Sequence, residues 1–455
     1  MRGSIFGRLV EALRDYGDRL RHFSPNARLF LAAAALGGVN AGVSGLLFNL
    51  YVLSLGYDEA FLGQVLSLGL LAALPGAAAG GPLVDHWGGK RVMLGGTALV
   101  GGGATALLLS PSALALQLGW ALVSMGGVLV YVAVSPFLAR HSTPHERQYL
   151  FAVTAAVYVV STAAGSGLGG ALPGMLAGLT EGLSRSDVYR VSLFAGACFS
   201  GLGIPLLLLV RERTPASERL ERPASPAAVP WRGAGEALRS RMITFGGALR
   251  DVAGRRGAAW IIAQFVVADG LIRFGGNVVV PYFNVFFVRH LGASEAWFGT
   301  LRVVERGIEV AAMLLVAPLA VRLGPVALIV ATQLCSVPLL LGLGFSPTLG
   351  LASAAFLFRG TLMEMTVPVR DGFMMDVVPE RYRATANATL LLLGYGIAFF
   401  GIRLGGALIA RGQFGLAFGI AAGFYVVSAL LYWRFFGARP EAARNRKLDL
   451  AALAG

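Results

Sequence analysis

Four charged side chains follow helical spacing inside an apolar stretch of the chain. Arg302, Glu305, Arg306 and Glu309 stand at i, i+3, i+4 and i+7, between "EAWFGT" and "AAMLLVAPLA". This spacing places all four on one face of a helix. A charged residue at the centre of a membrane helix costs about 2.5–3.5 kcal/mol to insert, so such residues usually face a cavity. The chemistry they offer is ion pairing, anion binding by arginine and proton exchange by a carboxyl group.

Other ionisable side chains occur in nearby apolar stretches, and we expect them to share that cavity. They are Asp269, Arg273, Arg359, Glu364 and Arg403. Arginines slightly outnumber acids in the combined set, and a guanidinium fork suits carboxylate or phosphate. The set therefore predicts a substrate or proton site for an anionic or zwitterionic compound. Asn40 is the candidate in the first half, where it either touches substrate or only bonds a neighbouring helix.

The composition excludes an ordinary soluble protein. Of the 455 residues, 56% are hydrophobic and 14% are charged, whereas soluble domains carry about 25% charged residues. The net charge of +14 indicates the positive-inside bias of a membrane protein rather than a nucleic-acid partner. Cys198 and Cys335 lie in separate apolar blocks, so the sequence indicates no disulfide framework, metal site or cofactor.

Twelve apolar segments are each long enough to cross about 30 Å of hydrocarbon as a helix. β-barrel strands would be about ten residues long with strict alternation, and this pattern does not occur. We therefore expect an all-α membrane protein with twelve transmembrane helices. The segments cover residues 28–55, 60–84, 91–109, 112–138, 148–177, 190–210, 258–288, 294–321, 325–345, 348–377, 384–410 and 413–436.

Positive charge predicts the orientation and the organisation of the chain. Arginine and lysine gather in alternate connections and in the central stretch, which the positive-inside rule places in the cytoplasm together with both termini. The expected parts are a cytoplasmic amphipathic helix at 1–27, a six-helix bundle at 28–210, a cytoplasmic linker at 211–257, a second bundle at 258–436 and a cytoplasmic tail at 437–455. The sequence thus predicts a multi-pass protein of the cell membrane.

The chain repeats itself at a nearly constant offset. "GYDEAFLG" at 56–63 recurs as "GASEAWFG" at 292–299, and "GSGLGGAL" at 165–172 recurs as "GIRLGGAL" at 401–408, both 236 residues later. The match predicts two pseudo-symmetric six-helix units, and internal repeats of this kind are typical of secondary transporters. At the same offset the four charges of residues 302–309 correspond to Leu66, Gly69, Leu70 and Ala73. The fold therefore does not require those charges, which favours a functional role.

The stretch "GGPLVDHWGGKRVML" resembles the loop motif of the major facilitator superfamily, and six spans, a loop and six spans match that family over the whole chain. The matching residues are Gly81, Leu83, Asp85, Gly88, Lys90 and Arg91. The resemblance implies a gating loop that stabilises the outward-facing state. His86 and Gly89 depart from the basic residues usual at their positions.

The resemblance implies a secondary transporter that works by alternating access, without catalytic residues. We expect proton-coupled export of a small amphipathic organic compound by a monomer in the lipid bilayer. A proton-coupled uptake symporter for a small polar or anionic metabolite is the alternative, and a non-transporting receptor or scaffold of the same fold is another. The histidines lie at span ends or in loops, which argues against an intramembrane metalloenzyme.

Overall fold

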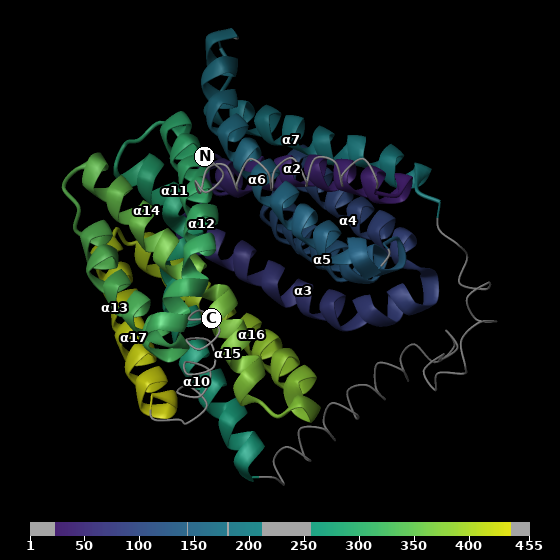
Figure 1. The fold of residues 1–455 in the computed structure, drawn as a ribbon. Helices are drawn as coiled ribbons and strands as arrows, with labels where there is room; N and C mark the ends of the chain where they lie inside the picture. Colours follow the sequence, from purple (N-terminus) through teal and green to yellow (C-terminus); the bar gives the residue numbers. More distant parts are fainter. Residues whose placement is uncertain (1–22, 143, 180–181, 212–255, 438–455) are drawn as a thin grey trace, which may run out of the picture.

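The fold was analysed in a computed structural model, which describes residues 23–142, 144–179, 182–211 and 256–437. The helix expected at 1–27, the linker at 211–257 and the tail at 437–455 lie outside these residues, apart from a few positions at their edges. The described chain is helical and forms two groups of helices, drawn in purple to blue and in green to yellow in Figure 1.

Six long helices form the first half. They are α2 (Pro25–Ser54), α3 (Glu59–Trp87), α4 (Gly89–Leu109), α5 (Ala113–Arg140), α6 (Pro144–Leu179) and α7 (Arg185–Leu209). The second half has six crossings, two of them built from shorter pieces. Its elements are α10 (Arg256–Val279), η2 (Val280–Tyr282), α11 (Phe283–Val285), η3 (Phe286–His290), α12 (Glu295–Leu323), α13 (Pro325–Gly344), α14 (Leu349–Met365), α15 (Val367–Val377), η4 (Glu380–Tyr382), α16 (Arg383–Ile409) and α17 (Phe414–Phe436).

The expected twelve-helix, two-bundle membrane fold is confirmed. Within the described ranges, ten helices are long and apolar enough to cross a membrane. The remaining crossings are α12, whose apolar run contains four charges, and the α14–α15 pair. The charges of α12 and the proline that interrupts the α14–α15 pair can both be read from the sequence.

Two crossings predicted as continuous helices are interrupted at prolines. The stretch expected at 348–377 breaks at Thr366, two residues before Pro368, and the stretch expected at 258–288 changes helix type around Pro281. Proline lacks the N–H that an internal helical residue donates, and its ring crowds the carbonyl four residues earlier. The expected spans were right in position and wrong in regularity.

Helix starts and turns repeat between the halves. Asp58 and Ser294 accept a hydrogen bond from the third residue of α3 and of α12, which satisfies one free N–H at each helix start. Gly88 and Gly324, which end the same two helices, have φ of 86° and 85°. Glycine adopts this left-handed conformation without a Cβ clash. The internal repeat read from the sequence is therefore a repeat of backbone geometry.

The two halves meet where α3 crosses α16 and where α6 crosses α12. Gly63 lies against Gly406 at the first crossing, and Gly170 lies against Gly299 at the second. A Cβ on Gly170 would stand 2.6 Å from the carbonyl oxygen of Glu295, so only glycine permits this approach. These glycines belong to the two repeated sequences, which therefore mark the contact between halves.

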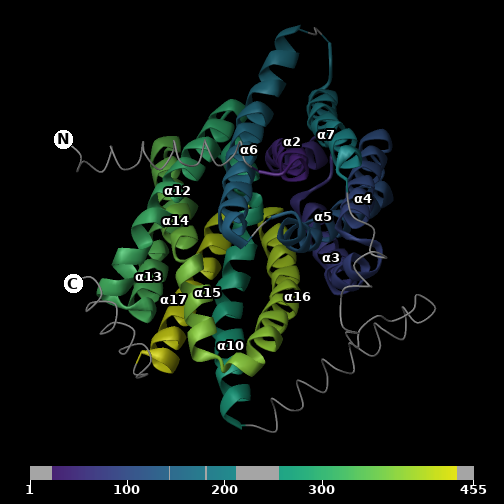
Figure 2. The ribbon, with the colours of Figure 1, turned by 45° about the vertical axis from the view of Figure 1, so that its right-hand side comes forward.

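We name the two ends of the molecule by the chain. The linker end is where α7 ends and α10 begins, and the far end is where α2 ends and α3 begins. In Figure 1, the start of α3 and the end of α16 lie side by side near the middle, and the two helices diverge toward the right and lower edges; Figure 2 shows α6 beside the second half. The halves are thus joined toward the far end and splayed toward the linker end.

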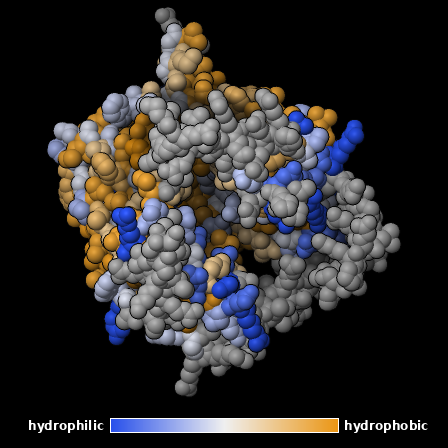
Figure 3. Space-filling model, in the orientation of Figure 1, coloured by the Kyte–Doolittle hydropathy of each residue, from blue (hydrophilic) through white to orange (hydrophobic). Residues whose placement is uncertain are grey.

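The outer surface suits a bilayer. In Figure 3 the left-hand face, formed by the second half, is mainly hydrophobic, and hydrophilic residues gather toward the lower and right-hand edges. Large apolar side chains are exposed on both halves, including Leu109, Leu179, Leu315 and Phe358. Exposed apolar area on this scale marks a surface that is covered by lipid or protein.

Candidate functional site

The four charges of α12 form two ion pairs along one side of the helix. Arg302 Nη1 lies 2.5 Å from Glu305 Oε2, and Arg306 Nη1 lies 2.7 Å from Glu309 Oε2, both at i,i+3 spacing. The glutamate side chains are 5% and 4% exposed, whereas the arginine side chains are 30% and 32% exposed. Each pair therefore buries its acid and leaves part of its guanidinium open.

The direction of this charged side follows from its neighbours. Glu305 packs against Gly360 of α14, where an added Cβ would meet its Oε1 at 2.5 Å. The exposed apolar side chains Val304, Ile308 and Leu315 lie roughly opposite Arg302 and Arg306 on the helix. The arginines thus face the space between α14 and α6, and the apolar side of α12 faces outward.

Aromatic rings surround the neighbouring arginine of α14. Arg359 is buried and donates a hydrogen bond from Nη2 to the hydroxyl of Tyr425. Its guanidinium lies 5.8 Å from the ring centre of Phe283 and 5.6 Å from that of Tyr425. Cation–π contacts and one hydrogen bond hold this charge, so Arg359 acts as a fixed positive centre behind the α12 pairs.

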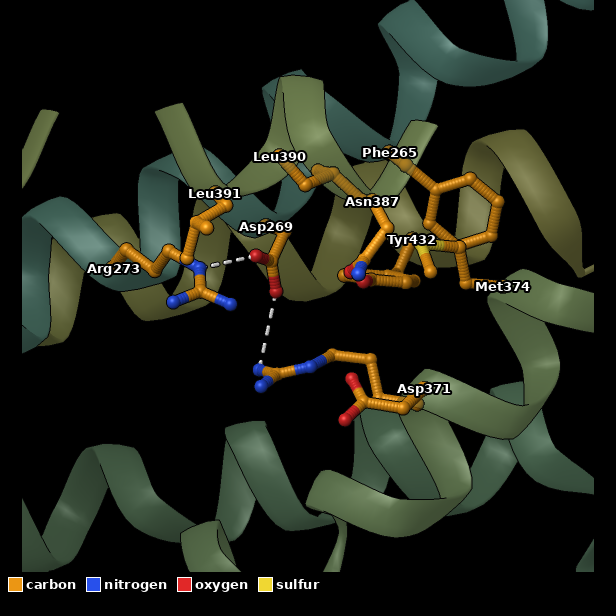
Figure 4. A pocket seen from close by; sticks show the side chains of 10 residues that line it. Phe265, Asp269, Arg273, Asp371, Met374, Asn387, Leu390, Leu391 and Tyr432 are labelled. Atoms are coloured by element: carbon orange, nitrogen blue, oxygen red, sulfur yellow. Dashed lines mark hydrogen bonds and ion pairs between the residues drawn. The ribbon is translucent and has the colours of Figure 1, made fainter. Parts of the chain in front are cut away.

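A second charged group lies on α10 and α15, and Figure 4 shows it from close by. Asp269 accepts a hydrogen bond from Arg273 Nε, and its Oδ1 lies 3.1 Å from Arg370 Nη1 as an ion pair without hydrogen-bond geometry. With Asp371 and Asn387, these residues line a small cavity of about 70 Å³. Asp269 is again the buried member, because its side chain is 6% exposed and that of Arg273 is 43% exposed.

The expected single cluster is therefore divided. The α12 pairs and the Asp269 group are separate networks, and Arg370, which was not among the expected site residues, completes the second. Glu364 is exposed, and Arg403 is exposed with its guanidinium 5.5 Å from the ring centre of Phe399. Neither forms an ion pair with another residue in the described part of the chain.

The loop motif between α3 and α4 ties two helices of the first half together. Lys90 donates hydrogen bonds of 2.7 and 2.6 Å to the carbonyls of Leu208 and Val210, at the end of α7. A lysine at this position satisfies free carbonyls and complements the negative end of the helix. Gly88 supplies the turn, Leu83 packs against the core, and Asp85 and Arg91 are exposed. The predicted gating role of these residues stays a prediction.

Two asparagines join the halves at the far end, with matching geometry. Asn49 donates to the carbonyl of Pro281 at 2.6 Å, and Asn284 donates to the carbonyl of Leu46 at 2.8 Å. The two amides also bond each other at 3.0 Å, across a separation of 235 residues. Each asparagine thus bonds the carbonyl three residues before the other, as a two-fold axis between the halves requires. The sequence shows both as polar residues in apolar helices, but it does not reveal that they pair.

Charged residues near helix starts reinforce this contact. Glu295 accepts hydrogen bonds from Arg185 Nη2 at 2.8 Å and from the Tyr189 hydroxyl at 2.5 Å. Glu59, which holds the corresponding place in the first half, lies 3.4 Å from Arg289 Nη1. The far end is therefore closed in this structure.

The first half contains a large cavity of about 860 Å³. Residues of α2, α4, α5, α6 and α7 line it, and most of them are apolar. Asn40 lies in its wall and bonds two serines, donating to Ser200 at 3.3 Å and accepting from Ser44 at 3.2 Å. Phe48 and Trp120, which also line it, stack with ring centres 4.0 Å apart. Asn40 was an expected site residue, whereas the cavity was not foreseen.

Comparison with solved structures shows the same fold in several transporters. The chain superposes on a mutant of the nucleoside transporter NupG with a TM-score of 0.67 and 16% identity, covering 90% of this chain and 100% of that one. The inward-open xylose transporter XylE from E. coli gives a TM-score of 0.64 and 16% identity, covering 90% and 96%. At these identities the likeness establishes fold alone.

One short stretch resembles a curated protein. It is 32% identical over 84 residues to the 3-(3-hydroxy-phenyl)propionate transporter of Escherichia coli (strain K12), and it covers 17% of this chain and 21% of that relative. The match thus spans about a fifth of the relative's length.

A family model extends the comparison to most of the chain. The model described as Major Facilitator Superfamily matches residues 29–304, which include the whole first half, the linker and the start of the second half. The match agrees with the two six-helix bundles and with the structural neighbours. The chain therefore belongs to the Major Facilitator Superfamily.

Proposed function

We propose that this chain, a multi-pass membrane transporter of the Major Facilitator Superfamily, exports a small amphipathic organic anion in exchange for protons. The main support for this proposal is the unequal exposure of the α12 ion pairs. Glu305 and Glu309 are buried, whereas Arg302 and Arg306 are partly exposed. An arginine has five N–H donors, so one already paired with glutamate can still receive a substrate carboxylate.

Competition for the arginines gives a coupling step. Exchange requires the substrate and the proton to occupy the site in alternate steps. After the substrate has left, a closing gate that draws Arg302 or Arg306 away deprives the buried glutamate of the partner that favours its charged form, and proton uptake then removes an unpaired buried charge, which is costly in an apolar site. When the site opens to the other side, the ion pair re-forms, the proton is released, and the remaining N–H donors of the arginine receive the next substrate carboxylate. Asp269, held between Arg273 and Arg370, offers the same chemistry at a second position.

The substrate class has two supports. The open arginines and the fixed charge of Arg359 favour a carboxylate or phosphate group. The short match to a transporter named for 3-(3-hydroxy-phenyl)propionate favours an aryl carboxylate. We therefore take 3-phenylpropionate as the probe of this class.

We propose export as the direction of transport. The positive-inside rule places the linker end in the cytoplasm, so the closed far end faces outward and the splayed linker end faces the cytoplasm, ready to load substrate for export. The second candidate is a symporter that takes up the same anion with protons. We retain this candidate because the chain has the same fold as a D-xylose-proton symporter, with a TM-score of 0.66.

Proteoliposomes loaded with labelled 3-phenylpropionate test the proposal. Exchange for protons predicts that a pH gradient with acid outside accelerates efflux, whereas symport predicts acceleration with acid inside. Arg302→Gln and Arg306→Gln should each raise the KM about tenfold or more, because a hydrogen bond to a charged group contributes about 1.5–3 kcal/mol. Arg322→Gln, near the end of α12, is the matched control. Equal KM values in all four proteins would refute the role of the α12 arginines.

A further inference from the structure

We propose that the cavity inside the first half, rather than the space between the halves, holds the apolar body of the substrate, as a flat ring system. This inference rests on the proposed function, because it concerns the same amphipathic anion. It adds a site, a residue set and a shape requirement that the charged helices do not provide.

Three glycines leave open space along the cavity wall. Gly37 and Gly45 of α2 and Gly127 of α5 line it, and an added Cβ on any of them would meet no atom within 4 Å. At the offsets of the internal repeat, 235 residues for α2 and 236 for α5, the corresponding residues are Ile272, Val280 and Met363. Side chains therefore occupy in the second half the positions left empty in the first.

Both halves place a pair of rings at the same positions of the repeat, and the second half adds further rings around its pair. Phe48 and Trp120 correspond to Phe283 and Phe356, which pack edge to face with centres 5.1 Å apart. Phe356 also contacts Phe287 and Phe298. Val123, which lines the cavity, corresponds to the ring-bound Arg359. The halves thus divide two tasks, because the second carries fixed charge and the first offers apolar space.

The cavity has the character of a ligand site. Sites for small organic molecules measure about 300–1,000 Å³, are mostly apolar and contain a few polar groups, and this one measures about 860 Å³. Water would find few hydrogen-bond partners along its apolar wall, and covering apolar surface with an apolar group is favourable. The lining therefore suits an apolar occupant.

Its lining favours an aromatic occupant. Trp120 and Phe48 present stacked rings at one end, and Tyr131 and Tyr158 are exposed large side chains in its wall. Aromatic faces and edges attract another ring beyond the contribution of buried area. The linked group of Asn40, Ser44 and Ser200 gives one polar point for a ring substituent. The ring is held here, and its acidic group is directed out of the cavity toward the second half.

The test uses the fluorescence of Trp120 in full-length protein in nanodiscs, with the other five of the six tryptophans replaced by phenylalanine. The probe is 3-(4-nitrophenyl)propionate, whose nitrophenyl ring quenches tryptophan at short range. We expect saturable quenching that 3-phenylpropionate competes away and that propionate, which has no ring, does not. Absence of saturable quenching would overturn the proposal.

Glycine variants locate the bound ring. Gly45→Leu and Gly127→Leu fill the cavity and should weaken quenching at least tenfold in apparent Kd. Gly102→Leu is the matched control. Gly102 is an exposed helical glycine, an added Cβ there would meet no atom within 4 Å, and the residue does not line the cavity. Unchanged Kd in both cavity variants would overturn the proposal, and so would quenching by bilayer lipids with brominated acyl chains in place of the probe.

Transport assays distinguish a failure of the cavity site from a failure of the proposed function. If the original protein moves 3-phenylpropionate against a pH gradient and both cavity variants move it with the same KM, the proposed function stands and the cavity site is wrong. If the probe quenches Trp120 and the glycine variants abolish quenching without any transport, the site stands and the transport proposal is wrong.

Discussion

At the scale of single residues, burial separates the members of each ion pair. Glu305, Glu309 and Asp269 are nearly inaccessible, and the arginines that bond them retain exposed surface. A buried ion pair adds little net stability, because desolvation of both groups offsets their attraction. This pattern is expected if substrate reaches the arginine from the space between the halves and the acid is shielded from solvent until its partner moves.

Gly360 offers a direct test of this arrangement. An alanine there would place a Cβ 2.5 Å from Glu305 Oε1, and the flexible end of the glutamate must shift away. We expect Gly360→Ala to weaken the Arg302–Glu305 pair, to flatten the dependence of transport on the pH gradient, and to change the melting temperature by only a few degrees. The measurement is gradient-driven transport of 3-phenylpropionate in proteoliposomes, together with thermal unfolding.

Gly350→Ala is the matched control for that change. Gly350 lies near the start of the same helix, and its Cβ would meet nothing within 4 Å. Alanine favours a helix over glycine by about 1 kcal/mol, so this variant should be equally or more stable and should keep its pH dependence. If Gly360→Ala and Gly350→Ala show the same dependence of transport on the pH gradient, the contact between Glu305 and Gly360 does not contribute to coupling.

At the scale of helices, small residues and polar pairs decide how the halves meet. The glycine crossings of α3 with α16 and of α6 with α12 allow close approach, and the Asn49–Asn284 contact links α2 to α11. Alternating access requires the far end to open, so these contacts must break once in each cycle. We regard the asparagine pair as a clasp that stabilises the closed far end.

Asn49→Ala and Asn284→Ala test the clasp. Each removes one donor to a main-chain carbonyl and one amide–amide hydrogen bond. We expect each to lower the stability of the closed state by about 1–2 kcal/mol, and the double variant to fall short of the sum because the two share a bond. Thermal unfolding reports stability, and maleimide labelling of a cysteine introduced at Ser54, in protein whose Cys198 and Cys335 are replaced by serine, reports far-end opening.

Asn26→Ala serves as the control for the asparagine variants. Asn26 bonds the main chain of Arg211 within the first half, at the linker end. It should lose similar hydrogen-bond energy without a gain in labelling at Ser54. Equal labelling of all three variants would show that the far-end asparagines do not hold the halves together.

At the scale of the whole molecule, the sequence was sufficient for the architecture. Apolar length predicted the spans, and the repeated "GYDEAFLG" and "GSGLGGAL" sequences contain the glycines at which the halves cross. Helical spacing also placed the α12 charges on one side correctly. These features depend on local periodicity and on the internal repeat, and both can be read along a single chain.

The features that sequence reasoning missed depend on contacts between distant segments. Arg370 joins Asp269 only because α15 packs beside α10, and Asn49 meets Asn284 only because the halves are related by a two-fold axis. Three glycines on two helices leave open space along the cavity wall, and in the sequence they looked like ordinary packing residues among the 62 glycines of the chain. A position-by-position comparison of the repeats, with Gly37, Gly45 and Gly127 against Ile272, Val280 and Met363, contained the signal.

The proposed transport cycle depends on proton exchange at the α12 acids during anion transport. The most direct measurement compares Glu305→Gln and Glu309→Gln with the original protein in proteoliposomes, using 3-phenylpropionate under an imposed pH gradient and then in counterflow without a gradient. We predict that the variants lose gradient-driven transport and keep counterflow, because glutamine preserves shape and cannot exchange a proton. Gradient-driven transport that is unchanged in both variants would contradict the account.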